Sequence, residues 1–164
     1  MRQAIANVPD FPRPGILFRD ISPLLKDHFD ETMDALDALL SPEEWGRVDA
    51  VAGIESRGFI LGAALAARRH KGFVLIRKQG KLPPPVVDVA YALEYGSGVL
   101  EMQRGRGRVL LIDDVLATGG TMTAAGDLCE RAGYAVQALA VLIDLKLVID
   151  YRWRALPLRT VVTY

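Results

Sequence analysis

Residues 109–121 read VLLIDDVLATGGT, and this stretch decides the fold. Its apolar start, Val109–Ile112, is typical of a buried parallel strand. Residues 113–120 then predict a polar loop, and residues 121–132 a helix that ends at Gly133. A strand that leads through such a loop into a helix is typical of open α/β sheets, which bind ligands at the carboxyl edge of their strands.

The same unit occurs earlier in the chain. Residues 48–54 form a short apolar strand pattern, and a polar break, Glu55–Gly58, follows them. Residues 59–68 predict a helix and residues 73–76 a second strand, while residues 136–143 complete the later unit. Two strand–helix–strand units predict an α/β fold with a parallel sheet and helices on both faces.

The remaining segments predict additions to one domain of residues 1–164. Residues 8–23, dense in proline, predict an ordered but irregular segment, and residues 30–40 predict an amphipathic helix. Residues 77–108 predict a mobile basic loop leading into a hairpin whose strands, 86–94 and 99–103, flank a turn at 96–98. A long exposed insertion in a compact domain is more often functional than idle.

Composition excludes several classes of protein. Lys and Arg number 20 and Asp and Glu 20, so the net charge of zero does not favour a protein that coats nucleic acid. The single cysteine, Cys129, cannot form an internal disulfide, which favours a reducing compartment. No apolar run approaches the length of a membrane span, and the first residues lack the apolar core of a signal peptide. We therefore expect a soluble, cytoplasmic protein without a membrane partner.

The polar residues within 109–121 predict that the ligand is a sugar phosphate. Gly119 and Gly120 let the backbone approach a ligand closely, and the helix that follows offers free N–H groups to a phosphate. Asp113 and Asp114 would repel phosphate but suit sugar hydroxyls, or a Mg²⁺ ion that bridges to phosphate. Either feature alone is more often an ordinary loop cap or turn, whereas their combination in this order favours a ligand site.

These residues resemble the phosphoribosyl-diphosphate signature of the type I phosphoribosyltransferases. Four further segments resemble the branch of that family that uses adenine: residues 11–21, 53–59, 77–83 and 93–96. The resemblance runs from about Val8 to Tyr164. The resemblance implies a homodimeric purine-salvage enzyme that transfers the 5-phosphoribosyl group of 5-phosphoribosyl 1-diphosphate to adenine. The products would be AMP and diphosphate, with Mg²⁺ as cofactor and no nucleic acid as partner.

The resemblance also implies a role for each part of the site. The 5′-phosphate would bind Ala117, Thr118, Gly119, Gly120 and Thr121. The ribose hydroxyls would bind Asp113 and Asp114, and these two carboxylates could also hold a Mg²⁺ carried by the substrate. Diphosphate would bind a loop with a cis peptide before its serine and a basic segment: Glu55, Ser56, Arg57, Gly58, Arg77, Lys78 and Lys81. Adenine would lie under a hood within residues 1–40, against Leu17, Phe18, Arg19 and Leu145. Residues 77–103 would form the catalytic loop and hairpin, with Tyr95 in the lid and Glu94, Arg57 and Lys81 as the catalytic groups.

Simpler interpretations of the charged residues stay open at this point. Arg57 and the basic run at 77–81 could be solvated surface groups, and Glu94 an exposed hairpin glutamate. Against this, Arg57 suits the charge that develops on leaving diphosphate, and a carboxylate in a closed lid suits proton transfer from adenine. Two other functions remain: transfer to hypoxanthine, guanine or orotate, and a regulator that binds the sugar diphosphate without turnover. Residues 146–155 match no signature.

Overall fold

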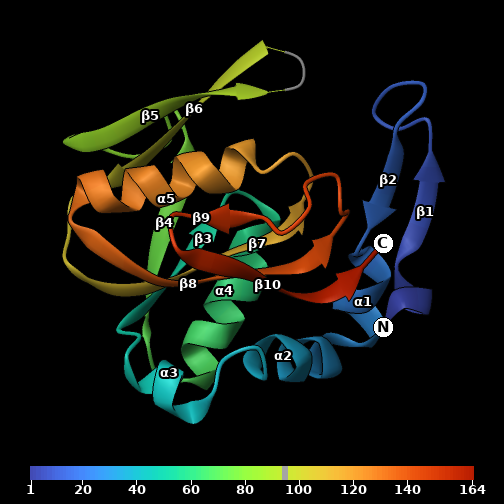
Figure 1. Cartoon of the computed structure of the whole chain (residues 1–164), viewed down its shortest axis with the longest axis horizontal. Helices are drawn as coiled ribbons and strands as arrows, with labels where there is room; N and C mark the ends of the chain where they lie inside the picture. The colour runs from blue at the N-terminus through green and yellow to red at the C-terminus, as the bar shows by residue number, and fades with distance from the viewer. Residues whose placement is uncertain (94–95) are drawn as a thin grey trace.

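The structure is a computed structural model that describes residues 1–93 and 96–164, and a mixed sheet forms its centre (Figure 1). In spatial order the eight strands described are β5 (Val86–Leu93), β6 (Gly96–Gln103), β4 (Gly72–Lys78), β3 (Ala50–Ile54), β7 (Gly107–Leu116), β8 (Tyr134–Asp144), β10 (Leu156–Thr163) and β9 (Arg152–Trp153). The five strands from β4 to β10 are parallel, while β5, β6 and β9 are antiparallel to their neighbours. The predicted parallel sheet is confirmed.

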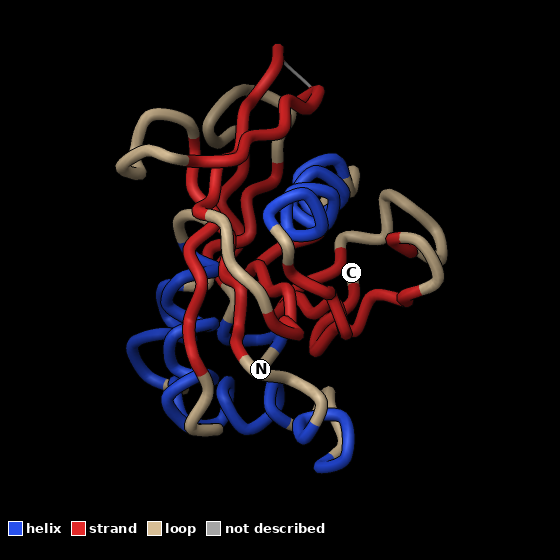
Figure 2. The backbone as a smooth tube through the Cα atoms, turned by 90° about the vertical axis from the view of Figure 1, so that its left-hand side faces the viewer, coloured by secondary structure: helices blue, strands red, loops and turns tan. Residues whose placement is uncertain are grey.

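Helices cover both faces of the sheet, as Figure 2 shows. One face carries α1 (Ser22–Asp27), α2 (Phe29–Asp37), α3 (Pro42–Gly46) and α4 (Arg57–Arg68), and the other carries α5 (Gly120–Ala132). Leu36 and Leu61 belong to the apolar cluster on the first face, and Leu128 to the cluster on the second. Each of these leucines is almost fully buried, which stabilises the fold by about 1.5–3 kcal/mol per side chain.

The burial of β7 explains the apolar run in its sequence. Val109–Ile112 are fully buried because strands pair with β7 on both sides and helices cover both of its faces. The strand continues to Leu116, however, with Leu116 opposite Asp144 of β8. The expected loop at 113–120 is therefore wrong in its first half, since Asp113 and Asp114 lie inside the strand.

The helix boundaries follow the local signals of the sequence. Ser41 and Glu44 form a capping box at the start of α3, with Ser41 Oγ accepting from Glu44 N at 3.2 Å and Glu44 Oε2 accepting from Ser41 N at 2.8 Å. Helix α5 ends at Gly133, whose φ of 104° is a left-handed conformation that favours glycine. No helix within residues 1–93 and 96–164 is long and apolar enough to cross a membrane.

The N-terminal segment is more regular than expected. A short 3-10 helix (Arg2–Ala4) precedes β1 (Ala6–Pro9) and β2 (Leu17–Asp20), which pair as an antiparallel two-stranded sheet. Pro9 ends β1 opposite Leu17, and Pro12 and Pro14 lie in the connection, where Asp10 Oδ1 accepts from Gly15 N at 2.7 Å. The prediction of an irregular segment at 8–23 was therefore wrong for the strand residues, and it holds for residues 10–16.

The hairpin also differs from the prediction. Gly96 lies opposite Leu93, so residues 96–98 begin β6 and the expected turn at 96–98 is wrong; residues 94 and 95 lie outside the described residues. Gly98 lies opposite Tyr91, and a Cβ there would come within 2.8 Å of the Tyr91 ring, so the missing side chain leaves room for the aromatic one. Arg77 pairs with Glu101 in the ladder between β4 and β6, which places Arg77 and Lys78 at the end of a strand and not in the expected loop.

Candidate functional site

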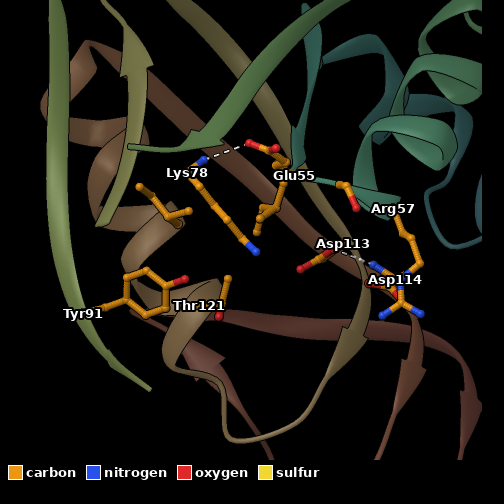
Figure 3. A pocket seen from close by; sticks show the side chains of 10 residues that line it. Glu55, Arg57, Lys78, Tyr91, Asp113, Asp114 and Thr121 are labelled. Carbon is orange, nitrogen blue, oxygen red and sulfur yellow. Dashed lines mark hydrogen bonds and ion pairs between the residues drawn. The ribbon is translucent and has the colours of Figure 1, made fainter. Parts of the chain in front are cut away.

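A cavity of about 320 Å³ opens at the carboxyl edge of the central strands (Figure 3). Strands β3, β4 and β7 end beside it, and the start of α4 contributes a further part of its wall. It is lined by Ile54, Glu55, Ser56, Arg57, Lys78, Tyr91, Leu100, Asp113, Asp114 and Thr121. The structure thus brings both expected ribose residues and four of the seven expected diphosphate residues (Glu55, Ser56, Arg57 and Lys78) to the edge where open α/β sheets bind ligands.

Two adjacent carboxylates on β7 dominate the charge of this cavity. Asp113 Oδ1 accepts from Asp114 N at 2.8 Å, and it lies so close to Gly58 that a Cβ there would come within 3.1 Å of this oxygen. Burial raises the pKa of Asp113 well above its ordinary value, and repulsion by Asp114 raises it further. Burial also raises the pKa of Asp114. A ligand with hydroxyl groups would satisfy these carboxylates where water is largely excluded.

Arg57, the first residue of α4, offsets part of this negative charge. Its Nε lies 2.9 Å from Asp114 Oδ2, and the ion pair lowers the pKa of Asp114 against the larger effect of burial. Asp114 Oδ2 is fully buried and makes no hydrogen bond to the described residues, so the ion pair with Arg57 is its main compensation. The Arg57 guanidinium also lies 5.0 Å from the centre of the Phe18 ring, which links β2 to the cavity.

Glu55 holds the basic segment that follows β4. Its carboxylate accepts from Lys81 Nζ at 2.8 Å, from Lys78 N at 3.0 Å and from Arg77 Nε at 3.3 Å. Burial by itself would raise the pKa of Glu55, but these donors outweigh it and lower the pKa to about 2. Glu55 is thus an anionic anchor for cations, and the peptide bond from Glu55 to Ser56 is cis, as the resemblance implied.

Lys78 behaves differently from its neighbours. Its backbone N–H is bound to Glu55, whereas its side chain extends into the cavity toward the space between Tyr91 and Asp113 (Figure 3). Lys81 and Arg77 turn toward Glu55, and Arg77 NH1 also donates to the Lys81 carbonyl at 3.1 Å. Among the three expected diphosphate-binding cations of this segment, Lys78 is the one that lines the cavity.

The turn after β7 forms a second, smaller cavity. Its volume is about 90 Å³, and Asp113 and residues 115–122 line it. Gly119 adopts a φ of 82° before α5 begins at Gly120, a conformation that side chains other than glycine rarely take. The first N–H groups of a helix of 13 residues face this turn, and they have no acceptor within the helix itself. All five expected phosphate-binding residues line this cavity.

Glu101 is a residue that the sequence argument missed. Its side chain is 3 % exposed, and it accepts from the backbone N–H groups of Gly80, Lys81 and Leu82 at 3.0, 2.7 and 2.7 Å. Burial raises the pKa of Glu101, but these hydrogen bonds outweigh it and the net pKa is lowered. One signal could have found it, since Glu101 is an acidic residue between the buried Leu100 and Met102.

The expected adenine-binding residues are less closely gathered. Leu17 is exposed, Phe18 lies beside Arg57, and the Arg19 guanidinium lies 3.8 Å from the centre of the Tyr164 ring. Leu145 donates its backbone N–H to the Leu116 carbonyl at 3.1 Å, at the end of β7. None of these four residues lines the two cavities just described. Glu94 and Tyr95 lie outside the described residues.

Comparison with known proteins agrees with this geometry. The family model described as "Phosphoribosyl transferase domain" matches residues 30–155. The chain is 49% identical to the adenine phosphoribosyltransferase of Hydrogenovibrio crunogenus, over 100% of this chain and 96% of the relative.

Solved structures extend this likeness to the fold. The adenine phosphoribosyltransferase of Thermoanaerobacter pseudethanolicus superposes with a TM-score of 0.89 at 37% identity, over 99% of this chain and 97% of that one. The Saccharomyces cerevisiae protein, solved with adenine and an imino-altritol bisphosphate, superposes with a TM-score of 0.89 at 33% identity, over 98% and 95% of the two chains. Fold, site geometry and full-length identity agree, and the chain belongs to the adenine phosphoribosyltransferase family.

Proposed function

We propose that this site transfers the 5-phosphoribosyl group of 5-phosphoribosyl 1-diphosphate to adenine, which yields AMP and diphosphate and salvages the purine. A ring nitrogen of adenine bonds to the anomeric carbon, the bond from that carbon to the diphosphate oxygen breaks, and adenine gives up a proton. One observation carries the proposal most directly. Two adjacent carboxylates of β7, the half-buried Asp113 and the buried Asp114, line the larger cavity; Asp113 also lines the cavity at the N-terminus of α5, and Asp114 pairs with Arg57.

Each part of this arrangement matches a part of the sugar diphosphate. Ala117, Thr118, Gly119, Gly120 and Thr121 receive the 5′-phosphate, for which the N-terminus of α5 supplies N–H donors and a positive dipole end. Asp113 and Asp114 accept hydrogen bonds from the ribose 2′- and 3′-hydroxyls. Because Asp114 is buried and Asp113 half-buried, these bonds form where contact with water is reduced, and they orient the ring for attack.

The diphosphate end lies over the start of α4. Ser56, Arg57 and Gly58 present backbone N–H groups and a guanidinium there, and Lys78 adds its ammonium from β4. Charge grows on the diphosphate as the anomeric carbon–oxygen bond lengthens, so these donors stabilise the transition state more than the bound substrate. Lys81 is released from Glu55 when the anionic ligand competes for it, and it then contributes to catalysis.

The base binds beside the N-terminal two-stranded sheet. Leu17, Phe18 and Arg19 of β2 and Leu145 after β8 form the adenine side of the site, and the contact of Phe18 with Arg57 supports this placement. The attacking base must lose a proton, and Glu94 is the carboxylate assigned to accept it, with Tyr95 beside it in the lid.

Magnesium fits this site only together with the substrate. The described residues contain no group of three or more His, Cys, Asp or Glu side chains that could hold a metal. Mg²⁺ commonly binds one or two carboxylates and keeps substrate phosphates and water as its other ligands, which Asp113 and Asp114 suit. When bound, Mg²⁺ neutralises charge on the diphosphate leaving group.

The organisation of the whole protein is part of the same proposal. Residues 1–164 act as one phosphoribosyltransferase domain, with residues 1–40 as hood and residues 77–103 as catalytic loop and hairpin. The protein works as a homodimer in the cytoplasm, where its one cysteine, the buried Cys129, stays reduced.

Product formation with a panel of bases tests the proposal. The purified protein receives Mg²⁺, 5-phosphoribosyl 1-diphosphate and one of adenine, hypoxanthine, guanine or orotate, and the nucleotide product is separated and quantified. We expect AMP from adenine and at most trace product from the other bases. Comparable turnover of another base would contradict the adenine assignment. Binding of the sugar diphosphate without turnover of any base would favour a regulator over an enzyme.

A further inference from the structure

Residues 146–155, which match no sequence signature, pack against the helix that begins at the phosphate-binding turn. The short strand β9 (Arg152–Trp153) pairs with the start of β10, with Trp153 opposite Leu156. Leu158 N also donates to the Tyr151 carbonyl at 3.2 Å, so the segment is fixed to the sheet on both sides of residue 152. Figure 1 shows β9 beside α5. Tyr151 and Trp153 extend from here toward α5.

Tyr151 contacts the phosphate-binding turn in two ways. Its ring lies on the Cα of Gly119, since a Cβ at this glycine would come within 2.5 Å of Tyr151 Cε2. Its hydroxyl lies 2.8 Å from Thr123 Oγ1 and donates to the Gly119 carbonyl at 3.4 Å. The Thr123 hydroxyl can in turn donate to Tyr151, so a short chain of hydrogen bonds runs from the first turn of α5 back to Gly119.

Trp153 makes a parallel contact two turns further along the helix. Its Nε1 donates to Asp127 Oδ1 at 2.9 Å, and its ring lies where a Cβ on Gly126 would come within 2.5 Å. Gly119 and Gly126 are seven residues apart and share one side of the helix, while Tyr151 and Trp153 share one side of an extended segment. Two aromatic side chains therefore pack on two glycines, one at the turn and one away from it.

We propose that Tyr151 is a positioning residue for the phosphate-binding turn, which it holds in the conformation that receives the 5′-phosphate. The inference rests on the proposed function, because it assigns that phosphate to residues 117–121. Gly119 needs a left-handed φ of 82°, which glycine adopts freely but does not maintain by itself. The ring of Tyr151 blocks movement of Gly119 on one side, and its hydroxyl adds a second, longer hydrogen bond to the Gly119 carbonyl, which also accepts from Thr123 N at 2.9 Å.

A turn that is ordered before the ligand arrives loses less conformational entropy on binding. Removing the contacts of Tyr151 leaves the phosphate donors in place but lets the turn sample other conformations. The cost then appears in the affinity for the phosphorylated sugar. It does not appear in the affinity for adenine, which binds on the other side of Asp113 and Asp114.

The test distinguishes a specific effect of Tyr151 on the phosphate-binding turn from a general packing effect of residues 146–155. Tyr151→Phe keeps the ring and removes the hydroxyl, whereas Tyr151→Leu removes both contacts. Trp153→Phe is the matched control, because it also removes one hydrogen bond from the same segment but touches Gly126 and not the turn. The measurements are calorimetric Kd values for ribose 5-phosphate, steady-state KM values for both substrates, and the thermal unfolding midpoint without ligand.

We expect Tyr151→Phe to bind ribose 5-phosphate about fivefold more weakly and Tyr151→Leu tenfold or more, as loss of a hydrogen bond and then of preorganisation predicts. KM for the sugar diphosphate rises in parallel, while KM for adenine stays unchanged. Trp153→Phe lowers the unfolding midpoint and leaves the sugar-phosphate Kd within about twofold of wild type.

Two results overturn the proposal. One is an unchanged Kd for ribose 5-phosphate in both Tyr151 variants, and the other is an equal loss in Trp153→Phe, which would mean general packing only. If Tyr151→Leu does not fold, Tyr151→Phe decides alone because its ring is retained. The binding measurement needs no turnover, so it tests the role of Tyr151 even if the protein forms no AMP.

Discussion

Arg57 Nε lies 2.9 Å from Asp114 Oδ2, so the first residue of α4 and the end of β7 are joined by an ion pair across the candidate site. The Asp114 side chain is 8% exposed and that of Arg57 33%, so the pair links a buried anion to a cation that can still reach a ligand. Burial raises the pKa of Asp114, and Arg57 lowers it in part. The diphosphate side of the site therefore helps to keep the ribose side ionised.

Replacing Arg57 should move the pH dependence of the reaction. In Arg57→Gln the cation that lowers the pKa of Asp114 is lost, so the pKa rises further and the acid limb of kcat/KM for the sugar diphosphate moves to higher pH. The limb belongs to the coupled pair Asp113–Asp114 and not to one residue. Arg57→Lys keeps the charge and should move the limb less. An acid limb at the same pH in all three proteins would contradict the role of this ion pair.

Asp113→Asn should make the protein more stable and less active. Asp113 is largely removed from water and lies next to another carboxylate, and both conditions raise its pKa and disfavour its ionised form. The neutral amide removes this repulsion, so we expect the free energy of unfolding at neutral pH to increase by about 1 kcal/mol. Chemical denaturation measures the gain, and AMP formation measures the loss of the ribose contact. A variant less stable than wild type at neutral pH would contradict the burial argument.

The same variant gives a pH test with a definite sign. The pKa of Asp113 is raised in the folded protein above the ordinary 3.8, so the folded state binds this proton more tightly than the unfolded chain does. Wild type therefore loses stability as the pH rises from that value through the raised pKa, and Asp113→Asn does not. The stability gain of the variant should grow toward neutral pH and vanish near pH 4, approximately the ordinary pKa of aspartate.

Glu101→Gln should loosen the segment that carries Lys81. The carboxylate accepts three backbone N–H groups, and an amide oxygen accepts them more weakly and places an NH₂ group beside donors. We expect the free energy of unfolding to fall by about 2 kcal/mol and trypsin to cut faster after Lys81 in the native protein. Glu130→Gln, which removes a surface ion pair with Arg154, is the control and should cut at the wild-type rate. Equal cleavage of Glu101→Gln and wild type would refute the anchoring role.

Gly58→Ala should damage the site by steric overlap. A Cβ at Gly58 would lie 3.0 Å from the Ile112 carbonyl oxygen and 3.1 Å from Asp113 Oδ1, and both neighbours are held by β7. We expect a loss of about 1–3 kcal/mol in unfolding free energy and a raised KM for the sugar diphosphate. In Gly46→Ala, by contrast, the new Cβ meets nothing within 4 Å, so this control should unfold like wild type. Denaturant titration of both variants makes the comparison, and equal stability would contradict the close packing at Gly58.

Local patterns predicted the fold well where one physical cause dominated. The apolar run at Val109–Ile112 and the stop at Gly133 act within a few residues, and both were confirmed. Predictions that depend on a distant partner did less well. Strand β7 continues through Asp113 and Asp114 because β8 pairs with it to Leu116, and no property of the two aspartates signals that partner.

The site shows the same division. The turn after β7 and the segment after β3 each consist of consecutive residues, so each could be found as a sequence motif. The structure gathers the two motifs at one edge of the sheet. Glu101 escaped notice because its partners are N–H groups about 20 residues away, which carry no side-chain signal. Tyr151 was missed for a similar reason, since its partner is a glycine brought near by the pairing of β9 and β10.

The rate of AMP formation in the variant Asp113→Asn/Asp114→Asn tests the central claim most directly. It is measured against wild type with saturating adenine, Mg²⁺ and a series of 5-phosphoribosyl 1-diphosphate concentrations, after unfolding curves confirm that both proteins are folded. We predict that wild type forms AMP and that kcat/KM for the sugar diphosphate falls at least a hundredfold in the variant, as the loss of two charged contacts to the ribose implies. A folded variant with wild-type kcat/KM would contradict the assignment of these carboxylates to the ribose.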